Sequence, residues 1–313
     1  MNGDAPTPYR VLVADDEPDV AKVTRLSLRN MRHNGRPVEL VVAATGAATV
    51  QAMRDDPGIA VVLLDVVMET DTAGLDACRA IRDELGNRFV RILLRTGQPG
   101  VAPERATIDD YDIDGYLPKT ELSTNRLYAA VRTALKAYEE LVDLERHRRV
   151  LALLNDTAVA LHPYEPLVLM LQRILGAAVT LAPTPLAVIR LHLHREGGEP
   201  RRWLLHLATS SDGAKASAAA AAEEAAERVE SHLAALDEPA PGAAAGGYLV
   251  PFTLHDGVGD GWLYVDGVVP DALARSALPL LAAHAANAVY AAALRPDPPV
   301  QRAVILEGER QQA

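Results

Sequence analysis

The chain contains one cysteine, no long apolar stretch and no excess of positive charge. Cys78 cannot form an internal disulfide, and its position in a helical pattern favours a small buried side chain over a nucleophile. No apolar run approaches the ~18 residues of a membrane-spanning helix. The N-terminal segment MNGDAPTPYR has neither a basic leader nor an apolar stretch. These absences predict a cytoplasmic protein with no membrane contact.

Positive charge is scarce along the chain. The formal net charge of −11 disfavours a broad surface for nucleic acid or anionic lipid. The dense basic segment RHRR, at 146–149, has neither a recognition-helix pattern nor a second basic segment beside it. We interpret it as a solvated stretch of helix and do not expect nucleic acid among the partners.

The length of 313 residues is sufficient for two domains, each with its own core. The first 140 residues alternate strand and helix signals. Five runs read as strands: YRVLVADDE, PVELVVAAT, IAVVLLDVV, VRILLRTG and DGYLPK. Two amphipathic helices between them place apolar residues on one face: Val20, Val23, Leu26 and Leu28 in the first, and Leu75, Cys78, Ile81 and Leu85 in the second. This order predicts an α/β fold with a doubly wound, five-stranded parallel sheet.

Polar residues stand at the ends of four of these strands. Asp15 and Asp16 follow the first, Asp65 closes the third, Thr96 ends the fourth and Lys119 follows the fifth. Open parallel sheets collect such residues at one edge, where ligands bind. Two carboxylates held close together need a cation, and Mg²⁺ meets that need through oxygen ligands while it keeps waters for a phosphoryl group.

A carboxylate at this edge can act as a nucleophile. Asp65 can form an acyl phosphate. Lys119 and the metal can neutralise the phosphoryl oxygens, and Thr96 can donate a hydrogen bond to them. The strand-end pattern therefore predicts phosphoryl chemistry.

These residues resemble the receiver domain of bacterial response regulators, over roughly residues 9–140. The resemblance implies that Asp65 accepts a phosphoryl group from a histidine kinase or a phosphotransfer protein. It also implies that Asp16, Asp65 and the Val67 carbonyl bind Mg²⁺, and that Asp15 supports the metal through water.

The resemblance further assigns the phosphoryl contact to Lys119 and a conformational switch to Thr96 with Tyr116. Tyr116 lies three residues before Lys119, as the aromatic switch position of that family requires. The alternative for Tyr116 is a tyrosine that only packs at a strand end.

The chain also departs from the common receiver pattern. The usual proline soon after the phosphoacceptor is missing, and the loop METDTAG is about one residue longer, which predicts an altered third crossover. Pro118 precedes Lys119 instead of following it. The segments DVVMETDTAGL, RTGQPGVAPER and YLPKTEL resemble one receiver subgroup, in which a domain of unknown function and often a cyclic-di-GMP phosphodiesterase, cyclase or kinase module follows.

A long helix is expected from Arg126 to about Leu154, with Ser123 or Thr124 as its cap. Five of its residues have the three-four spacing of a coiled-coil seam: Leu127, Val131, Ala134, Tyr138 and Leu141. The seam fits two interpretations equally well. One is a helix that dimerises, and thus a homodimer; the other is the inward face of a receiver's last helix.

The second half of the chain has antiparallel character. PLAVIRLHLHRE and RRWLLHLATS alternate as neighbouring strands, and YLVPFTLHD and GWLYVDGVV flank the turn GVGDG. An Ala-rich helix and the flexible connection DEPAPGAAAGG lie between these pairs, and a helix over LPLLAAHAANAVYAAAL closes the domain. This element order resembles a GAF or PAS sensory module, with an unknown ligand.

His192, His194 and His206 share the face of this sheet away from the core, where they could meet a metal or stay as simple polar positions. HD phosphohydrolase, GGDEF cyclase, nucleotide-binding kinase and helix-turn-helix motifs are absent from the sequence. We therefore do not expect an enzyme.

We interpret the chain as a response regulator. Residues 1–140 form the receiver, with the helix continuing to about 154. Residues 155–297 form the sensory or interaction domain, and 298–313 a tail. Output is expected through a conformational or dimerisation change. The alternative is the regulatory part of a longer cyclic-di-GMP phosphodiesterase, cyclase or kinase whose catalytic module lies beyond Ala313.

Overall fold

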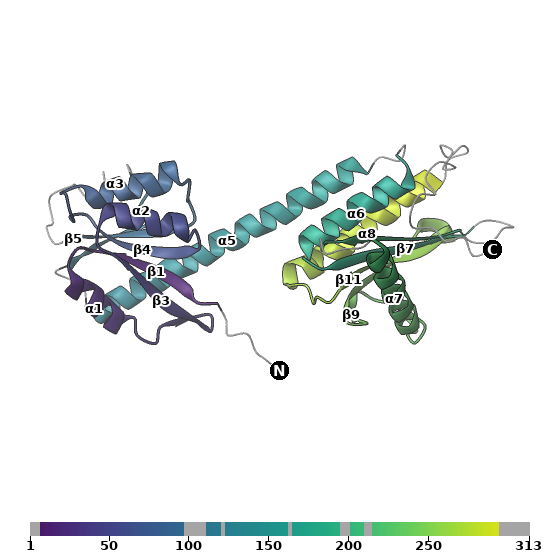
Figure 1. Cartoon of the computed structure of the whole chain (residues 1–313), viewed down its shortest axis with the longest axis horizontal. Coiled ribbons are helices and arrows are strands. Elements are labelled where there is room, and N and C mark those ends of the chain that lie inside the picture. The colour runs from purple at the N-terminus through teal and green to yellow at the C-terminus, as the bar shows by residue number, and fades with distance from the viewer. Residues whose placement is uncertain are drawn as a thin grey trace. The chain divides into compact units, whose positions relative to one another are not determined.

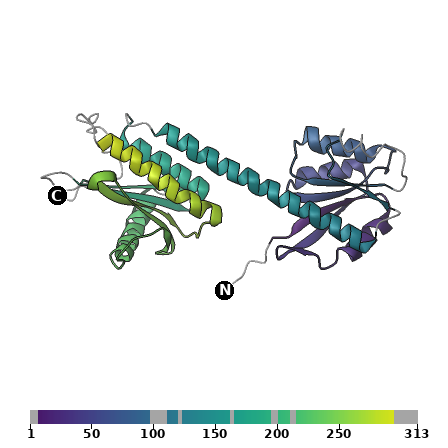
Figure 2. The ribbon, with the colours of Figure 1, turned by 180° about the vertical axis from the view of Figure 1, so that it is seen from behind.

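The computed structural model describes residues 7–96, 111–119, 123–161, 165–194, 201–209 and 215–293. The chain divides into two compact units, Met1–Glu145 and Arg146–Ala313. Each unit has its own sheet, as Figure 1 and the reverse view in Figure 2 show. Within the described residues no helix is both long and apolar enough to cross a membrane.

The first unit is built on a six-stranded sheet with the order β2-β3-β1-β4-β5-β6. Five of its strands are parallel to one another: β1 (Tyr9–Ala14), β3 (Arg36–Ala43), β4 (Ile59–Asp65), β5 (Arg91–Thr96) and β6 (Gly115–Pro118). Every residue of β4 is buried, because helices cover both faces of the central strands. The predicted doubly wound parallel sheet is confirmed.

Helices cover the two faces of this sheet. On one face lie α2 (Gly46–Asp55) and α3 (Ala73–Arg79), which continues as a π-helical turn over Ala80–Glu84. The other face carries α1 (Pro18–Ser27) and the first part of α5 (Thr124–Ala160). Figure 1 shows these helices on opposite sides of the strands.

The sixth strand, β2 (Arg32–His33), pairs with β3 in antiparallel orientation and was not predicted. His33 faces Arg36 across a two-residue turn, in which Asn34 and Gly35 have φ of 48° and 78°. An Asn-Gly pair adopts this left-handed turn readily, and the turn closes a tight hairpin.

The predicted inward face of α1 is confirmed at Leu28, which is 3% exposed, and wrong at Val23 and Leu26, which are 59% and 69% exposed. Thr24, which was not predicted to face inward, is fully buried. The buried stripe therefore follows Thr24 and Leu28, at the spacing of one helical turn. In contrast, the inward residues predicted for α3 and its π-helical turn are buried or packed against the core.

Helix α5 begins at the predicted cap. The backbone N–H of Arg126 donates to Ser123 Oγ at 3.3 Å, and that of Leu127 donates to the Ser123 carbonyl at 3.0 Å. Leu127 and Val131 of the predicted seam lie in the core of the first unit, with exposures of 1% and 0%. This first part of the seam is thus the inward face of the helix. The helix continues to Ala160, past the predicted end.

The second unit contains an antiparallel sheet with the order β8-β7-β11-β10-β9. Its strands are β7 (Leu186–Leu193), β8 (Arg201–Ala208), β9 (Gly242–Ala244), β10 (Gly247–Thr253) and β11 (Gly259–Asp266), with a 3₁₀ turn at His255–Gly257. Both predicted strand pairs are confirmed.

Three helices complete this unit. α6 (Leu167–Leu181) and α8 (Ala272–Ala293) pack against one face of the sheet, and α7 (Lys215–Leu233) against the other. Two elements differ from expectation. α6 was not predicted, and part of the expected flexible connection is the edge strand β9, joined to β10 through Ala245 and Gly246 at φ of 51° and 88°.

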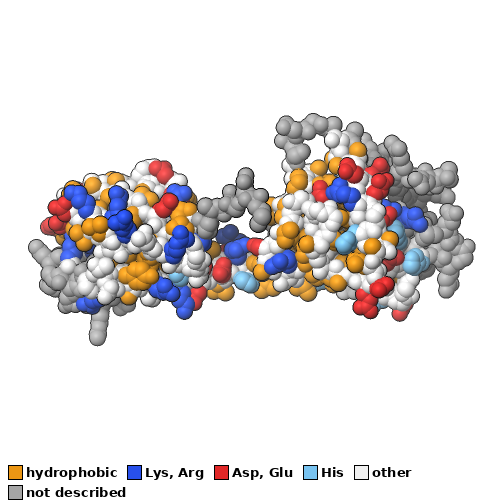
Figure 3. All heavy atoms as spheres, turned by 90° about the horizontal axis from the view of Figure 1, so that it is seen from below, with side chains coloured by type: hydrophobic (Ala, Val, Ile, Leu, Met, Phe, Trp, Pro, Cys, Tyr) orange, Lys and Arg blue, Asp and Glu red, His pale blue; other side chains and the backbone are white. Residues whose placement is uncertain are grey.

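Charged side chains of both signs are interspersed on the surface. In the face shown in Figure 3, Lys and Arg lie among Asp and Glu over each unit.

Candidate functional site

The carboxyl ends of β1 and β4 place two buried acidic residues on the same side of the sheet. Asp15 and Asp65 are only 2% and 3% exposed, whereas Asp16 and Glu17 are exposed. The backbone fixes this turn, because Asp15 N–H donates to the Ala43 carbonyl at 3.0 Å and Glu17 N–H donates to Asp15 Oδ1 at 3.1 Å.

Lys119 connects these carboxylates. Its Nζ donates to Asp65 Oδ2 at 2.8 Å and to Glu17 Oε1 at 3.1 Å. It also forms an ion pair with Asp15 Oδ2 at 3.2 Å. The ammonium group follows β6, so three separate segments of the first unit meet at this cation. The predicted juxtaposition of Asp15, Asp65 and Lys119 is therefore observed.

The electrostatics of the site reflect its burial. Burial raises the pKa of Asp65 above its ordinary value, although the hydrogen bond and charge of Lys119 oppose the rise. Burial by itself lowers the pKa of Lys119, but the hydrogen bonds to Asp65 and Glu17 outweigh it and raise the pKa overall. Lys119 thus stays charged at neutral pH and favours the ionised form of Asp65.

The site has the chemistry of a divalent-cation site. Oxygen atoms of Asp15, Asp16 and Glu17 lie within 4.8 Å of one another, and no other such group is found among the described residues. Asp15 Oδ2 lies beside the Lys119 ammonium at 3.2 Å in the ion pair, is buried and accepts no hydrogen bond from the described residues, so this oxygen can also take a hard cation. These residues fit Mg²⁺. Glu17 was missed by the sequence reasoning, although it directly follows the predicted acidic pair.

The loop after Asp65 is tied to the sheet and to neighbouring helices. Val66 N–H donates to the Arg95 carbonyl at 3.1 Å, and Gly74 N–H donates to the Val66 carbonyl at 3.0 Å. Glu69, in the lengthened METDTAG segment, accepts from the Gly46 N–H at the start of α2, at 2.9 and 3.1 Å to its two oxygens. The carboxylate caps that helix end, where partial positive charge favours an anion.

The remaining predicted residues lie on β5, on β6 and in the loop after β4. Val67, whose carbonyl was predicted as a metal ligand, lies in the loop and is 36% exposed. Thr96 ends β5 opposite Pro118 in the strand register, and its side chain lies outside the described residues. The ring of Tyr116 packs against the core beneath α2 and α3.

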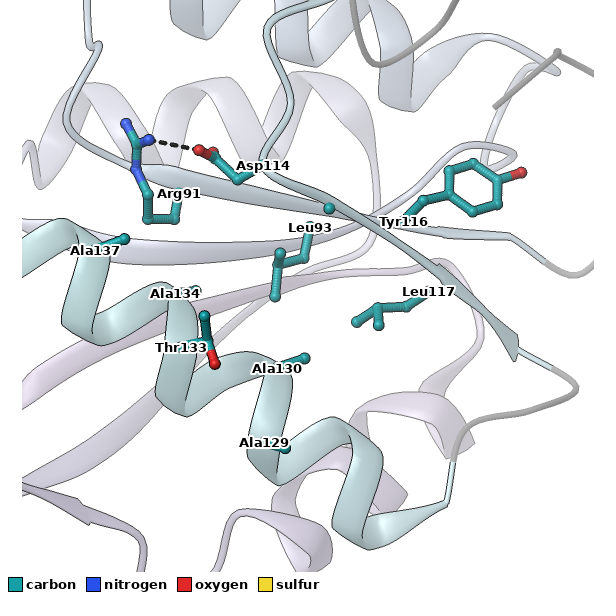
Figure 4. Close-up of a pocket in the computed structure, with 11 residues that line it drawn as sticks. Arg91, Leu93, Asp114, Tyr116, Leu117, Ala129, Ala130, Thr133, Ala134 and Ala137 are labelled. Atoms are coloured by element: carbon teal, nitrogen blue, oxygen red, sulfur yellow. Dashed lines mark hydrogen bonds and ion pairs between the residues drawn. The ribbon is translucent and has the colours of Figure 1, made fainter. Parts of the chain in front are cut away.

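Tyr116 and Leu117 leave β6 toward different sides of the sheet (Figure 4). On the Leu117 side, a surface pocket of about 410 Å³ lies between β5, β6 and α5. Small side chains of α5 line it, and the ion pair between Arg91 and Asp114 stands at its edge. This pocket is separate from the acidic site.

The three histidines of the second unit do not form one group. His192 Nδ1 and His194 Nε2 lie 3.6 and 3.3 Å from the carboxylate of Asp260. His206 instead pairs with Val188, farther along the sheet. Among the described residues no candidate metal group contains a histidine.

Comparison with known proteins identifies the first unit. Residues 11–132 match the family model of the response regulator receiver domain. The chain is 45% identical over 138 residues to 3'3'-cGAMP-specific phosphodiesterase 2 of Vibrio cholerae serotype O1, covering 44% of this chain and 26% of that protein. It is 29% identical over 133 residues to the DNA-binding response regulator MtrA of Mycolicibacterium smegmatis, covering 42% of this chain and 52% of MtrA.

Solved structures of receiver domains are also similar. A CheY-like receiver domain protein from Methanospirillum hungatei JF-1 has 19% identity and a TM-score of 0.36, covering 43% of this chain and 98% of that one. The receiver domain of an HD domain-containing protein from Pseudomonas fluorescens Pf-5 has 18% identity and a TM-score of 0.39, covering 46% and 98%.

The phosphodiesterase relative corrects one expectation. The sequence analysis excluded an enzyme, yet a receiver 45% identical to this one is part of a phosphodiesterase. The match covers the receiver half alone and establishes no enzymatic activity for this chain. Together, the parallel sheet order, the Asp15–Asp65–Lys119 site and the family match over residues 11–132 identify the N-terminal part of the chain as a response regulator receiver domain.

Proposed function

We propose that Asp65 is the phosphoacceptor of this receiver domain. The observation that supports this most directly is the 2.8 Å hydrogen bond from Lys119 Nζ to the buried Asp65 carboxylate, beside the acidic group of Asp15, Asp16 and Glu17. Asp65 is the one member of this site that closes a central, fully buried strand. A rigid strand end holds the nucleophile in place for attack.

The proposed reaction transfers a phosphoryl group. A carboxylate oxygen of Asp65 attacks the phosphorus of a phosphohistidine on a histidine kinase or phosphotransfer protein, the P–N bond breaks and an acyl phosphate forms. The leaving imidazole nitrogen takes up a proton. Lys119 binds the transferred oxygens. Asp15, Asp16 and Asp65, with the Val67 carbonyl and the additional candidate Glu17, would hold Mg²⁺, which supplies neutralising charge when bound.

Helix α1 offers an exposed apolar surface to the protein that donates the phosphoryl group. Val23 and Leu26 are 59% and 69% exposed on α1, which begins directly after the acidic turn. The two side chains are three residues apart and therefore neighbours on the helix surface, and contiguous exposed apolar surface marks protein contacts. We propose that a kinase or phosphotransfer protein contacts these two residues while its phosphohistidine approaches Asp65.

The output is proposed to pass through α5 to the second unit. Thr96 and Tyr116 would form the switch that responds to phosphorylation, and a change in α5 would alter either dimerisation or the second unit. The antiparallel domain over 155–297 would then act as a sensory or interaction module of the GAF or PAS type.

A second candidate function is favoured by the phosphodiesterase relative, whose receiver is 45% identical. In this proposal the chain is the regulatory part of a longer cyclic-dinucleotide phosphodiesterase, and phosphorylation at Asp65 controls a catalytic module. The reading frame after Ala313 distinguishes the two candidates. A phosphodiesterase module encoded there would favour the second.

Phosphoryl acceptance can be tested with the purified chain. We expect a small phosphodonor such as acetyl phosphate to add one phosphoryl group in the presence of Mg²⁺ and none in the presence of EDTA. The label should be lost with hydroxylamine, as an acyl phosphate is, and peptide mass spectrometry should locate it at Asp65. A label at another residue, or equal labelling without Mg²⁺, would contradict the proposal.

Mg²⁺ should stabilise the unphosphorylated protein. An ion that binds only the native state raises the free energy of unfolding by ~2.7 kcal/mol at a hundred times its dissociation constant. We therefore expect the receiver transition to rise in temperature across a Mg²⁺ titration, and Asp16→Ala to remove most of the rise. Asp19→Ala, which changes an exposed carboxylate in the first turn of α1, is the control. Equal responses of wild type and Asp16→Ala would mean that the ion binds elsewhere.

A further inference from the structure

A second cation, Arg95, lies on the same face of the sheet as the buried carboxylate of Asp65. Arg95 pairs with Asp65 in the parallel register of β4 and β5, so the two side chains leave the same face of the sheet. The residues two positions earlier on these strands, Leu63 and Leu93, pack in the core beneath α1 and α5. Asp65 and Arg95 therefore both project to the α1 side.

Arg95 is buried with few partners. It is only 5% exposed, and among the described residues its guanidinium has one hydrogen bond, in which Nη1 donates to Thr24 Oγ1 at 3.1 Å. Its Nε is buried without an acceptor. A buried charge that lacks full hydrogen bonding destabilises the native state. Packing alone does not explain a guanidinium here, because an aliphatic side chain would fill the same position without that cost.

The charged groups that act on Arg95 are carboxylates of the proposed site. Burial lowers its pKa, while the charges of Asp15, Asp65 and Glu17 oppose the decrease. Thr24, from α1, holds the guanidinium in place and is itself fully buried. Arg95 is thus a fixed positive charge beneath the site, separate from Lys119, which contacts the carboxylates directly.

We propose that Arg95 is an electrostatic positioning residue of the phosphoacceptor site, which favours the added phosphoryl charge and weakens Mg²⁺ binding to the unphosphorylated site. Phosphorylation brings about two negative charges to a site that already holds several carboxylates. A buried cation on the adjacent strand offsets part of this charge without contacting the reacting atoms. The same charge repels a divalent cation before phosphorylation. The inference rests on the proposed function of Asp65.

The test measures both effects in the full chain, because removal of the charge should strengthen Mg²⁺ binding and weaken binding of a phosphoryl mimic. In Arg95→Met, which removes the charge but keeps a long apolar side chain, we expect Mg²⁺ to bind about tenfold more tightly, since a buried charge on the adjacent strand shifts the equilibria of a site by roughly that factor. Thermal stabilisation by Mg²⁺ measures the affinity. At saturating Mg²⁺, the concentration of beryllofluoride, a phosphoryl mimic, needed for half-maximal stabilisation should rise about tenfold.

Two further variants separate charge from structure. Arg95→Lys retains the charge and should restore both affinities toward wild type. Thr24→Val removes the hydrogen bond to Arg95 but no charge, so it should lower the melting temperature without tightening Mg²⁺ binding. Weaker binding of both ions in Arg95→Met, or no change in either, would overturn the inference. The Mg²⁺ titration requires no phosphorylation, so it tests Arg95 even if the wild type accepts no phosphoryl group from any donor.

Discussion

Replacement of Asp65 by Asn is expected to abolish phosphoryl labelling by small donors in the presence of Mg²⁺. The amide of Asn has almost the shape of the carboxylate but is not a nucleophile. The fold should remain intact, because the Asn Oδ1 can still accept the hydrogen bond that Lys119 Nζ donates to Asp65 at 2.8 Å. Lys119 also keeps its contacts with Asp15 and Glu17. Label per protein molecule, quantified by intact mass, measures the effect.

The matched control is Asp71→Asn, which changes an exposed carboxylate in the same loop. This variant should accept label to the wild-type extent. Hydroxylamine-sensitive label that persists in Asp65→Asn would show that another carboxylate is the acceptor, and the assignment of Asp65 would fail.

Gly74→Ala is expected to destabilise the receiver strongly. A Cβ at this position would lie 1.9 Å from the Asp65 carbonyl oxygen, 2.8 Å from its carbonyl carbon and 2.9 Å from Val66 Cα. All three atoms belong to the backbone, so no side-chain rotation relieves the clash, and overpacking of this kind costs about 3 kcal/mol or more. The residue that must move is Asp65, so labelling should fall as well.

The chain provides a spectroscopic means of locating the effect. Both tryptophans, Trp203 and Trp262, belong to the second unit, whereas far-ultraviolet circular dichroism reports on both units. Gly74→Ala should shift the dichroism transition and leave the tryptophan transition in place. Gly176→Ala is the control of opposite sign. It lies within α6, where an added Cβ meets no atom within 4 Å, and it should stabilise the second unit by about 1 kcal/mol. A coincident shift of both signals in Gly74→Ala would contradict a local clash.

Strands whose apolar pattern matches their burial along the whole strand were predictable from the sequence. The strand IAVVLLD is apolar on both faces, and such runs occur where helices cover a parallel sheet from both sides. The antiparallel strands of the second unit were equally clear, because their alternation matches the period of a pleated sheet.

The errors arose where tertiary contacts overrode local pattern. Thr24 is polar and was not among the residues predicted to face inward. Its hydroxyl accepts a hydrogen bond from Arg95, which makes it an inward residue and turns Val23 and Leu26 to the surface. The strand β9 follows a segment rich in alanine, proline and glycine. Its turn is held by a distant residue, Tyr264, whose hydroxyl donates to the Ala245 carbonyl at 2.8 Å. No local signal reports such a contact. The hairpin of β2 is different, since its Asn34–Gly35 turn was visible in the sequence and was overlooked.

For the site, strand-end positions predicted the meeting of Asp15, Asp65 and Lys119, because the carboxyl ends of parallel strands share one edge. Glu17 was missed because its approach to Lys119, at 3.1 Å, depends on the turn that leads into α1. Arg95 was missed because its position within a strand gave no indication that a charge is buried there. Of the two alternatives left open for the three histidines, register favours simple polar positions, because it places His206 opposite Val188.

The burial of Cys78 determines how the chain will behave toward thiol reagents. Its side chain is fully buried, its Sγ donates to the Tyr111 carbonyl at 3.3 Å, and burial raises the pKa of the thiol to about 11. Very little reactive thiolate is therefore present or reachable at neutral pH. Alkylation of this one cysteine requires a transient opening of the receiver core. The rate of alkylation therefore reports how often that core opens, with no competing signal from a second thiol.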